Sequence, residues 1–208
     1  HLVGNPRIII NYRNAHMISD NIDFILASQS PRRAQLLKEI GIHFRQWVTE
    51  CNEEYPIQLD GSEIPLFLSQ TNAKACNAPL KENSLIIAAD TIVWNGQEAL
   101  GKPHNQEEAQ QMLKSLSGRT HQVITGTTLR SLHHCHSFVC TTQVTFTTLS
   151  DEDINYYIEH YHPFDKAGSY GIQEWIGMTG IKRIDGCFYN VMGLPLPALY
   201  QEIKKWTW

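Results

Sequence analysis

The sequence predicts an α/β fold in which a mixed central β-sheet is flanked by helices. Segments with helical periodicity alternate with segments rich in β-branched residues along most of the chain. Residues 85–94, LIIAADTIVW, form a nearly continuous apolar run of the kind that is buried on both faces of a sheet. Two long alternating segments, residues 121–130 and 136–149, predict an antiparallel hairpin, so the sheet is mixed rather than purely parallel.

The length and composition allow one domain with a full hydrophobic core. Of the 208 residues, 42% are hydrophobic and 18% are charged, as in ordinary globular proteins. Residues 1–22 show no clear periodicity, and we interpret them as an N-terminal extension. Residues 23–208 are then a single domain, or two lobes that share one sheet.

Charge, hydropathy and cysteine content argue against several classes of protein. The 17 basic and 21 acidic side chains give a net charge of −4, which provides no general basic surface for DNA or RNA. The longest apolar runs reach about ten residues, fewer than the roughly 20 that a membrane-spanning helix needs. Five cysteines, an odd number without a CxxC pair, predict free thiols and a cytoplasmic location.

The first predicted unit is a buried strand followed by a helix. Residues 23–28 form the strand. Ser30 is a preferred N-cap residue, Pro31 suits the first helical position, and Gly41 ends the helix. Residues 42–49 then alternate like a second strand.

A second helix and the central strand follow. We expect this helix over residues 62–78, with Pro65 tolerated in its first turn and Pro79 ending it. Residues 85–94 form the central strand, which a single charged residue, Asp90, interrupts.

The third predicted helix has clear signals at both ends. Residues 95–97, NGQ, are typical of a hairpin turn. Asn105 and Glu108 then resemble a capping box that begins a helix, and Gly118 ends it.

The next segments predict the hairpin and a fourth helix. Residues 121–130 and 136–149 are the two strands, with a turn at residues 131–135. Ser150 and Asp153 form the N-terminal signal of the helix after the hairpin.

The C-terminal part predicts irregular structure followed by strands and a helix. A glycine-rich loop covers residues 165–173. Short strands are expected near residues 178–184 and 187–192, and Pro195 begins the last helix.

Asp90 is the most informative single residue. A carboxylate inside an apolar strand costs several kcal/mol unless it is paired, hydrogen-bonded, protonated or bound to a metal ion. One interpretation is a structural Asp that accepts backbone hydrogen bonds, and the other is a functional acid. Thr91 points to the opposite face if the strand is regular.

Two arginines occupy the first turn of the first helix. The free N–H groups there already carry partial positive charge, so Arg32 and Arg33 are unfavourable at this place unless an anion binds them. A helix N-terminus and guanidinium groups together suit a phosphate. The alternative is that both arginines are exposed and pair with Glu53 or Glu54.

Two lysines are further candidates for anion binding. Residues 96–103, GQEALGKP, begin like a phosphate-binding loop, but Pro103 replaces the Ser or Thr that holds magnesium, so we reject that motif. Lys102 is either aimed at a site by its restricted backbone or is a surface lysine. Lys74, seven residues after Phe67 on one helix face, either extends from the core edge or points into a cleft.

Two further clusters have simpler interpretations. The run HHCH at residues 133–136 does not have the spacing of a zinc site. The aromatic residues that we expect in the core or between lobes, with stacking on a ligand left open for one of them, are Tyr156, Tyr157, Tyr161 and Trp175.

Six segments occur in a recognisable order: LASQSPRRAQLL, AADTIV, GKP, LSGRTHQVITG, DKAGSYGIQ and NVMGLPL. With them the chain resembles the Maf family of nucleoside triphosphate pyrophosphatases, which are related in fold to inosine triphosphate pyrophosphatases. The resemblance implies two lobes around a cleft. It also implies hydrolysis of a nucleoside triphosphate to the monophosphate and pyrophosphate, with Mg²⁺ or Mn²⁺ as cofactor, and a possible homodimer.

The resemblance also implies roles for individual residues. Asp90 corresponds to the acid that activates water and holds the metal ion, and Glu53 to a ligand of the metal ion or of water. The cations that the resemblance assigns to the triphosphate are Arg32, Arg33, Lys74 and Lys102.

Three positions separate the substrate branches of the family. Arg32, Thr91 and Gln173 resemble the branch that acts on dTTP and UTP, whereas the branch that acts on 7-methyl-GTP has an aromatic residue, Gln and Glu there. A Gln amide can pair with the imide edge of uracil or thymine. The alternatives are a pyrophosphatase for 7-methyl-GTP or another noncanonical purine nucleotide, and a nucleotide-binding regulator of septum formation that does not hydrolyse its ligand.

Two positions depart from the family pattern. Glu174 follows Gln173 where glycine is usual, which predicts an altered loop and base preference. Asn52 precedes Glu53 where an acidic residue is common, which predicts lower metal affinity.

Overall fold

The computed structural model describes residues 21–51 and 54–208. Within them a seven-stranded mixed sheet has the order β2-β1-β3-β5-β6-β7, and β4 pairs with β3 outside this path. The first three strands of the chain pair in parallel, and the other pairs are antiparallel. The strands are β1 (Asp23–Leu26), β2 (Phe44–Gln46), β3 (Ser84–Trp94), β4 (Ala99–Leu100), β5 (Thr120–Arg130), β6 (Cys135–Phe146) and β7 (Ile181–Asp185).

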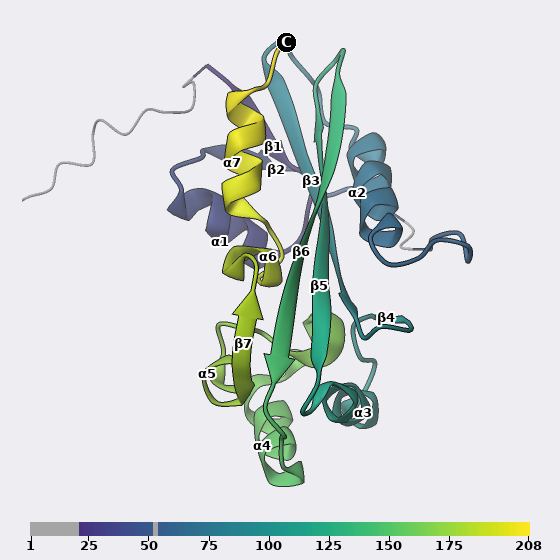
Figure 1. Ribbon diagram of the computed structural model, residues 1–208. Coiled ribbons are helices and arrows are strands. Elements are labelled where there is room, and N and C mark those ends of the chain that lie inside the picture. Colours follow the sequence, from purple (N-terminus) through teal and green to yellow (C-terminus); the bar gives the residue numbers. More distant parts are fainter. Residues whose placement is uncertain (1–20, 52–53) are drawn as a thin grey trace, which may run out of the picture.

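Helices cover both faces of the sheet, which confirms the predicted fold class. Figure 1 shows α1 and α7 on one face and α2 on the other, with α3, α4 and α5 around the opposite end. The helices are α1 (Pro31–Glu39), α2 (Glu63–Ala75), α3 (Gln106–Leu116), α4 (Asp151–Tyr161), α5 (Trp175–Gly180), α6 (Phe188–Val191) and α7 (Leu196–Lys204), with 3-10 turns at Pro163–Asp165 and Ala167–Ser169. In the described part of the chain, no helix has the length and apolar character needed to cross a bilayer.

Local signals set the beginnings of three helices as predicted. Ser30, Asn105 and Ser150 each accept a hydrogen bond from the backbone N–H three residues later, at 3.4, 2.8 and 3.1 Å. Such a cap satisfies an N–H group that the helix itself leaves unpaired, and its loss typically costs about 1 kcal/mol.

Two hydrophobic clusters divide the molecule into two lobes on one sheet. One lobe packs α1 and α7 against the sheet, with Leu36 and Leu199 fully buried. The other packs α3 and α4 against its opposite end, with Leu113 and Tyr157 fully buried. The long strands β3, β5 and β6 run between both ends of the molecule (Figure 1).

The C-terminal prediction is partly wrong. Residues 187–192, expected as a strand, contain the short helix α6. Its buried Asn190 side chain donates hydrogen bonds to the Val123 carbonyl and the Thr142 hydroxyl, both at 3.0 Å, and these long-range contacts favour a helical turn. The strand expected near residues 178–184 begins only at Ile181, because α5 occupies the residues before it.

Other boundaries also differ from the expectation. The strand predicted over residues 42–49 is limited to Phe44–Gln46, where it pairs with β1. The two-residue strand β4, which follows the predicted turn at residues 95–97, was not expected.

Gly126 allows α2 to pack closely on the sheet, and its replacement is predicted to destabilise the fold. A Cβ atom at this position would lie 2.2 Å from the Pro65 carbonyl oxygen. Because backbone atoms cannot move aside cheaply, we expect Gly126→Ala to lower the free energy of unfolding by about 3 kcal/mol. Chemical denaturation measures this loss. Gly101→Ala is the control, since a Cβ there meets nothing within 4 Å, and equal stability of the two variants would contradict the prediction.

His121 predicts a loss of stability in mild acid. The residue is 3% exposed, its Nε2 lies 2.7 Å from the Tyr170 hydroxyl, and burial lowers its pKa to about 4. The unfolded chain takes up a proton below pH 6.5 and the folded chain does so only near pH 4, so the unfolding free energy falls across this window.

Denaturation at pH 7 and pH 5 tests this expectation. Between pH 7 and pH 5, the unfolding free energy of the wild type should fall by about 2 kcal/mol more than that of His121→Gln. The unfolded chain binds one additional proton over roughly 1.5 pH units of this range, which corresponds to this energy. The matched control is His133→Gln, whose side chain is 67% exposed and which should keep the wild-type pH dependence. Identical pH dependence in all three proteins would refute the role of His121.

Candidate active site

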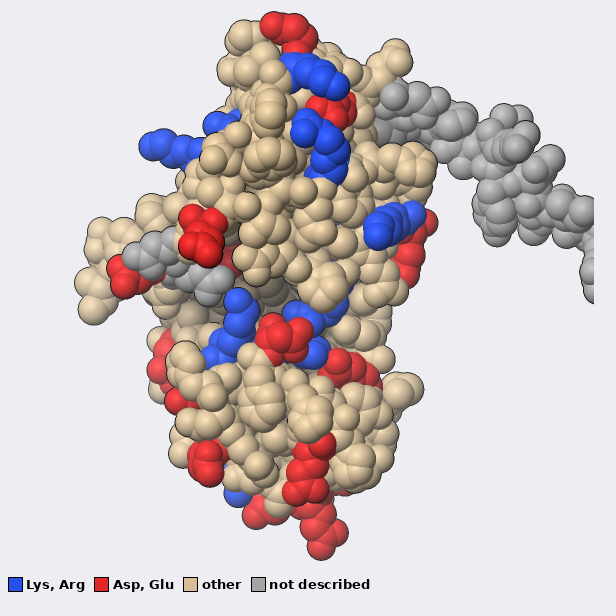
Figure 2. Space-filling view, turned by 180° about the vertical axis from the view of Figure 1, so that it is seen from behind, with Lys and Arg blue, Asp and Glu red and all other residues tan. Residues whose placement is uncertain are grey.

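A cavity of about 690 Å³ lies between the two lobes. The loop between β1 and α1, the middle of β3, the loop after β4 and residues 165–173 all line it. Figure 2 shows a hollow at mid-height of the molecule, with Lys and Arg side chains beside Asp and Glu side chains at its margin.

The cavity lies where one edge of β3 has no neighbouring strand among the described residues. β1 pairs with β3 only over residues 84–87, and β4 pairs only at Val93 and Trp94. Residues 88–92 lie between these two pairings. The predicted site residues Asp90 and Thr91 therefore lie at an open sheet edge, and both line the cavity.

Asp90 is half-buried and borders the cavity, so it is not sealed inside the sheet. The buried residue before it, Ala89, is 1% exposed. A carboxylate with apolar strand neighbours but access to a polar cavity has low solvation and can still meet a ligand. This placement allows the functional interpretation of Asp90, which stays a prediction.

Arg33 connects three parts of the site. Its guanidinium donates hydrogen bonds to the Gly193 carbonyl at 2.8 Å, the Thr91 hydroxyl at 3.1 Å and the Ser28 hydroxyl at 3.2 Å. The Thr91 hydroxyl thus contacts α1. These three hydrogen bonds hold the Arg33 guanidinium at the wall of the cavity, which Arg33 also lines.

Arg32 has a partner that the sequence prediction missed. Its Nη1 lies 2.8 Å from Asp165 Oδ2, and Lys166 Nζ lies 2.7 Å from the other oxygen of the same carboxylate. Burial raises the pKa of Asp165, but the hydrogen bonds from Lys166 and Arg32 outweigh this effect and hold the pKa below its usual value. Asp165 is therefore ionised at neutral pH.

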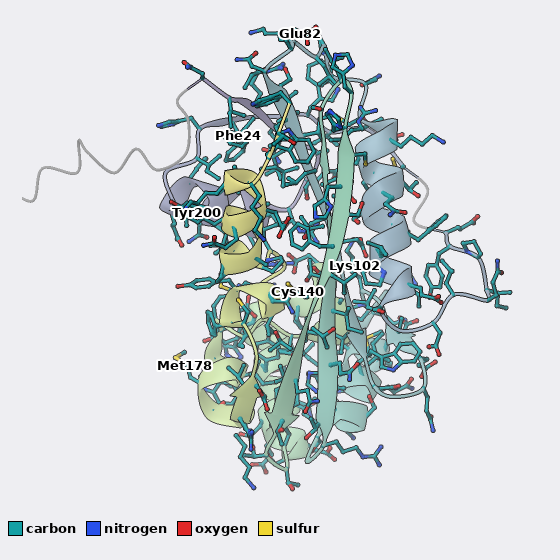
Figure 3. The ribbon with its side chains drawn as sticks, turned by 45° about the horizontal axis from the view of Figure 1, so that its top comes forward. Phe24, Glu82, Lys102, Cys140, Met178 and Tyr200 are labelled. Atoms are coloured by element: carbon teal, nitrogen blue, oxygen red, sulfur yellow. The ribbon has the colours of Figure 1, made fainter. Side chains whose placement is uncertain are left out.

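Lys102 reaches the cavity because two loops are joined. The backbone N–H of Gly168 donates to the Gly101 carbonyl at 3.0 Å, which fastens the glycine-rich loop to the residue before Lys102. Gly168 has φ +67° and a Cβ there would lie 2.8 Å from the Val93 side chain, so this close approach requires glycine. Lys102 lies midway along the molecule (Figure 3) and lines the cavity.

Of the other predicted site residues, one lines the cavity, one does not, and one lies outside the described residues. Gln173 is exposed at the margin of the cavity and lines it. Lys74 is exposed on α2 and does not belong to the lining, although Asn72 does. Glu53 lies outside the described residues, while Glu50 before it lines the cavity.

Lys166 lines the cavity but was not predicted as a site residue, and its partner Glu174 was noted in the sequence only as a departure from the family pattern. Lys166 Nζ lies 3.1 Å from Glu174 Oε1, and the Tyr157 hydroxyl donates to the other Glu174 oxygen. Burial, and then the hydrogen bond to Glu174, raise the pKa of Tyr157, so it stays a protonated donor. The adjacent opposite charges of Asp165 and Lys166 in a glycine-rich segment were the available sequence signal.

The cavity has donors that suit a divalent cation. The described residues contain no group of three or more His, Cys, Asp or Glu side chains able to hold a metal ion. Mg²⁺, however, is often held by one or two carboxylates together with substrate phosphates. Asp90 and Glu50 supply such hard oxygen donors in the lining. Near HHCH, His133 and His136 lie instead beside single glutamates.

Comparisons with known proteins show the family of the chain. A family model described as "Maf-like protein" matches residues 23–206. The "dTTP/UTP pyrophosphatase" of Phocaeicola vulgatus is 52% identical over 87% of this chain and 94% of that protein, and the protein of the same name from Cytophaga hutchinsonii is 54% identical over 89% and 84%. A solved HAM1 protein from Coxiella burnetii is 14% identical with a TM-score of 0.41, over 60% of this chain and 73% of that one. The chain belongs to the Maf family.

Proposed function

We propose that the protein is a nucleoside triphosphate pyrophosphatase that hydrolyses dTTP and UTP to the nucleoside monophosphate and pyrophosphate. The observation that carries this proposal is the position of Asp90 at an open strand edge, in a cavity that Arg32, Arg33 and Lys102 also line. The names of relatives that share about half of their residues with the chain support the same activity.

The residues of the cavity can divide the reaction between an acid and several cations. Asp90 accepts the proton of a water molecule whose oxygen attacks the α-phosphorus. The bond from the α-phosphorus to the bridging oxygen breaks, and pyrophosphate leaves with the electron pair. Arg32, Arg33 and Lys102 stabilise the charge that grows on this leaving group.

A divalent cation is part of the proposal. Asp90 would hold it together with Glu53, a residue that remains a prediction from the sequence, and Mg²⁺ or Mn²⁺ when bound there supplies polarisation of the phosphate oxygens. Lys74 remains a predicted contact of the triphosphate.

Base selection is assigned to Gln173 at the margin of the cavity, with Arg32 and Thr91. The exposed amide of Gln173 can both donate and accept a hydrogen bond, as the imide edge of uracil or thymine requires. The odd number of cysteines supports a cytoplasmic location. A homodimer is proposed only from the family resemblance.

A panel of nucleotides tests the proposed activity. With Mg²⁺, pyrophosphate release from dTTP and UTP should show the highest kcat/KM among dTTP, UTP, CTP, GTP and 7-methyl-GTP. A preference for 7-methyl-GTP would favour the purine alternative. Binding without turnover of any triphosphate would favour the regulator of septum formation.

Replacement of the proposed base tests the role of Asp90. Asp90→Asn keeps the shape of the side chain but cannot accept the proton, so we expect kcat to fall about 10³-fold while KM changes little. The control is Asp151→Asn, an exposed aspartate at the start of α4, which should keep wild-type kinetics. Full turnover by Asp90→Asn would show that another group activates water.

A further inference from the structure

Lys166 is a nearly buried cation at the wall of the cavity. Its side chain is 10% exposed, and it is one of the residues that line the cavity. Its ammonium group lies 2.7 Å from Asp165 Oδ1 and 3.1 Å from Glu174 Oε1. Burying an ammonium group is costly unless such partners hold it, so the position of Lys166 depends on these two carboxylates.

The Glu174 side chain is directed at Lys166 rather than at its own helix. Glu174 occupies the N-cap position of α5, but its side chain makes no capping hydrogen bond. One oxygen contacts Lys166 and the other accepts from the hydroxyl of Tyr157, a fully buried residue of α4. The carboxylate is thus anchored to the core of the lobe.

Gly171 makes this arrangement possible. A Cβ atom at Gly171 would lie 2.8 Å from Glu174 Cδ and 3.1 Å from Lys166 Cε, so both side chains pack directly on its backbone. The Gly171 N–H also donates to the Tyr157 hydroxyl at 3.0 Å. The four groups form a compact polar cluster next to the cavity.

The two carboxylates at Lys166 differ in what a bound phosphate would do to them. Asp165 also pairs with Arg32, so phosphate oxygens that bind Arg32 compete with the Asp165 carboxylate. Glu174 is fixed by Tyr157 and has no such competitor among the contacts described above. When an anion displaces Asp165, Glu174 still holds the ammonium group at the cavity wall.

We propose that Lys166 is an additional cation that binds the polyphosphate of the substrate, and that Glu174 is the residue that positions it. This inference rests on the proposed function, because it assumes that the cavity binds a nucleoside triphosphate. It adds a substrate-binding residue from the glycine-rich loop to Arg32 and Arg33 of α1 and Lys102 of the loop after β4.

Binding of inorganic tripolyphosphate tests the role of Lys166 without any turnover. Calorimetry in the presence of Mg²⁺ should give a dissociation constant about tenfold higher for Lys166→Met than for the wild type, the effect of one charge-assisted hydrogen bond. In steady-state kinetics the KM for dTTP should rise by a similar factor, while kcat stays within about threefold. Unchanged tripolyphosphate affinity would overturn the proposal.

A double-mutant cycle tests positioning by Glu174. Glu174→Ala alone should weaken tripolyphosphate binding about tenfold, and adding it to Lys166→Met should cause little further loss, because both changes remove the same contact. Independent losses of about 100-fold in the double variant would overturn the positioning role. Glu174→Gln, which keeps an acceptor for Lys166, should restore part of the affinity and serves if Glu174→Ala does not fold.

Controls separate this inference from the proposed function. Glu159→Ala, at an exposed position of α4, should leave affinity and KM unchanged. If the wild type hydrolyses dTTP and Lys166→Met has the wild-type KM and affinity, only the role of Lys166 is wrong. If no nucleotide is hydrolysed but the variants lose tripolyphosphate affinity as the double-mutant cycle predicts, the proposed function is wrong and the assignment of Lys166 is supported.

Discussion

The site depends on the interrupted pairing along one edge of β3. β1 pairs with β3 as far as Ile87, and β4 pairs with it from Val93, so the residues between face a cavity instead of another strand. Another strand along this edge would occupy the space beside residues 88–92 in which the cavity lies. The chain meets this constraint by ending β1 early and turning directly into α1, which brings its two arginines to the same opening.

The positive charge around this opening is kept in place by two kinds of partner. Arg33 uses neutral acceptors from three segments, whereas Arg32 and Lys166 share the carboxylate of Asp165. The neutral contacts fix the geometry of Arg33, while the shared carboxylate lowers the cost of holding Arg32 and Lys166 close together. A polyanion that enters the cavity can replace Asp165 without disturbing the neutral contacts.

Sequence reasoning recovered the parts of the structure that depend on neighbouring residues. The caps at Ser30, Asn105 and Ser150 and the long hairpin follow from side chains within a few positions of one another. It failed at α6, where the buried amide of Asn190 decides the conformation through strands far away in sequence. The pairing of Arg32 with Asp165 spans 133 positions, and no local pattern encodes it.

The continuity of the long strands limits how the two lobes can move. β5 and β6 pair without interruption from Thr120 to Arg130, so the same hydrogen-bonded ribbon belongs to both lobes. Bending the two lobes toward each other would strain this ribbon, because neither β5 nor β6 is interrupted by a linker and the turn at residues 131–134 lies at one end of the pair. Adjustment of the cavity to ligands of different size therefore falls to the loops that line it.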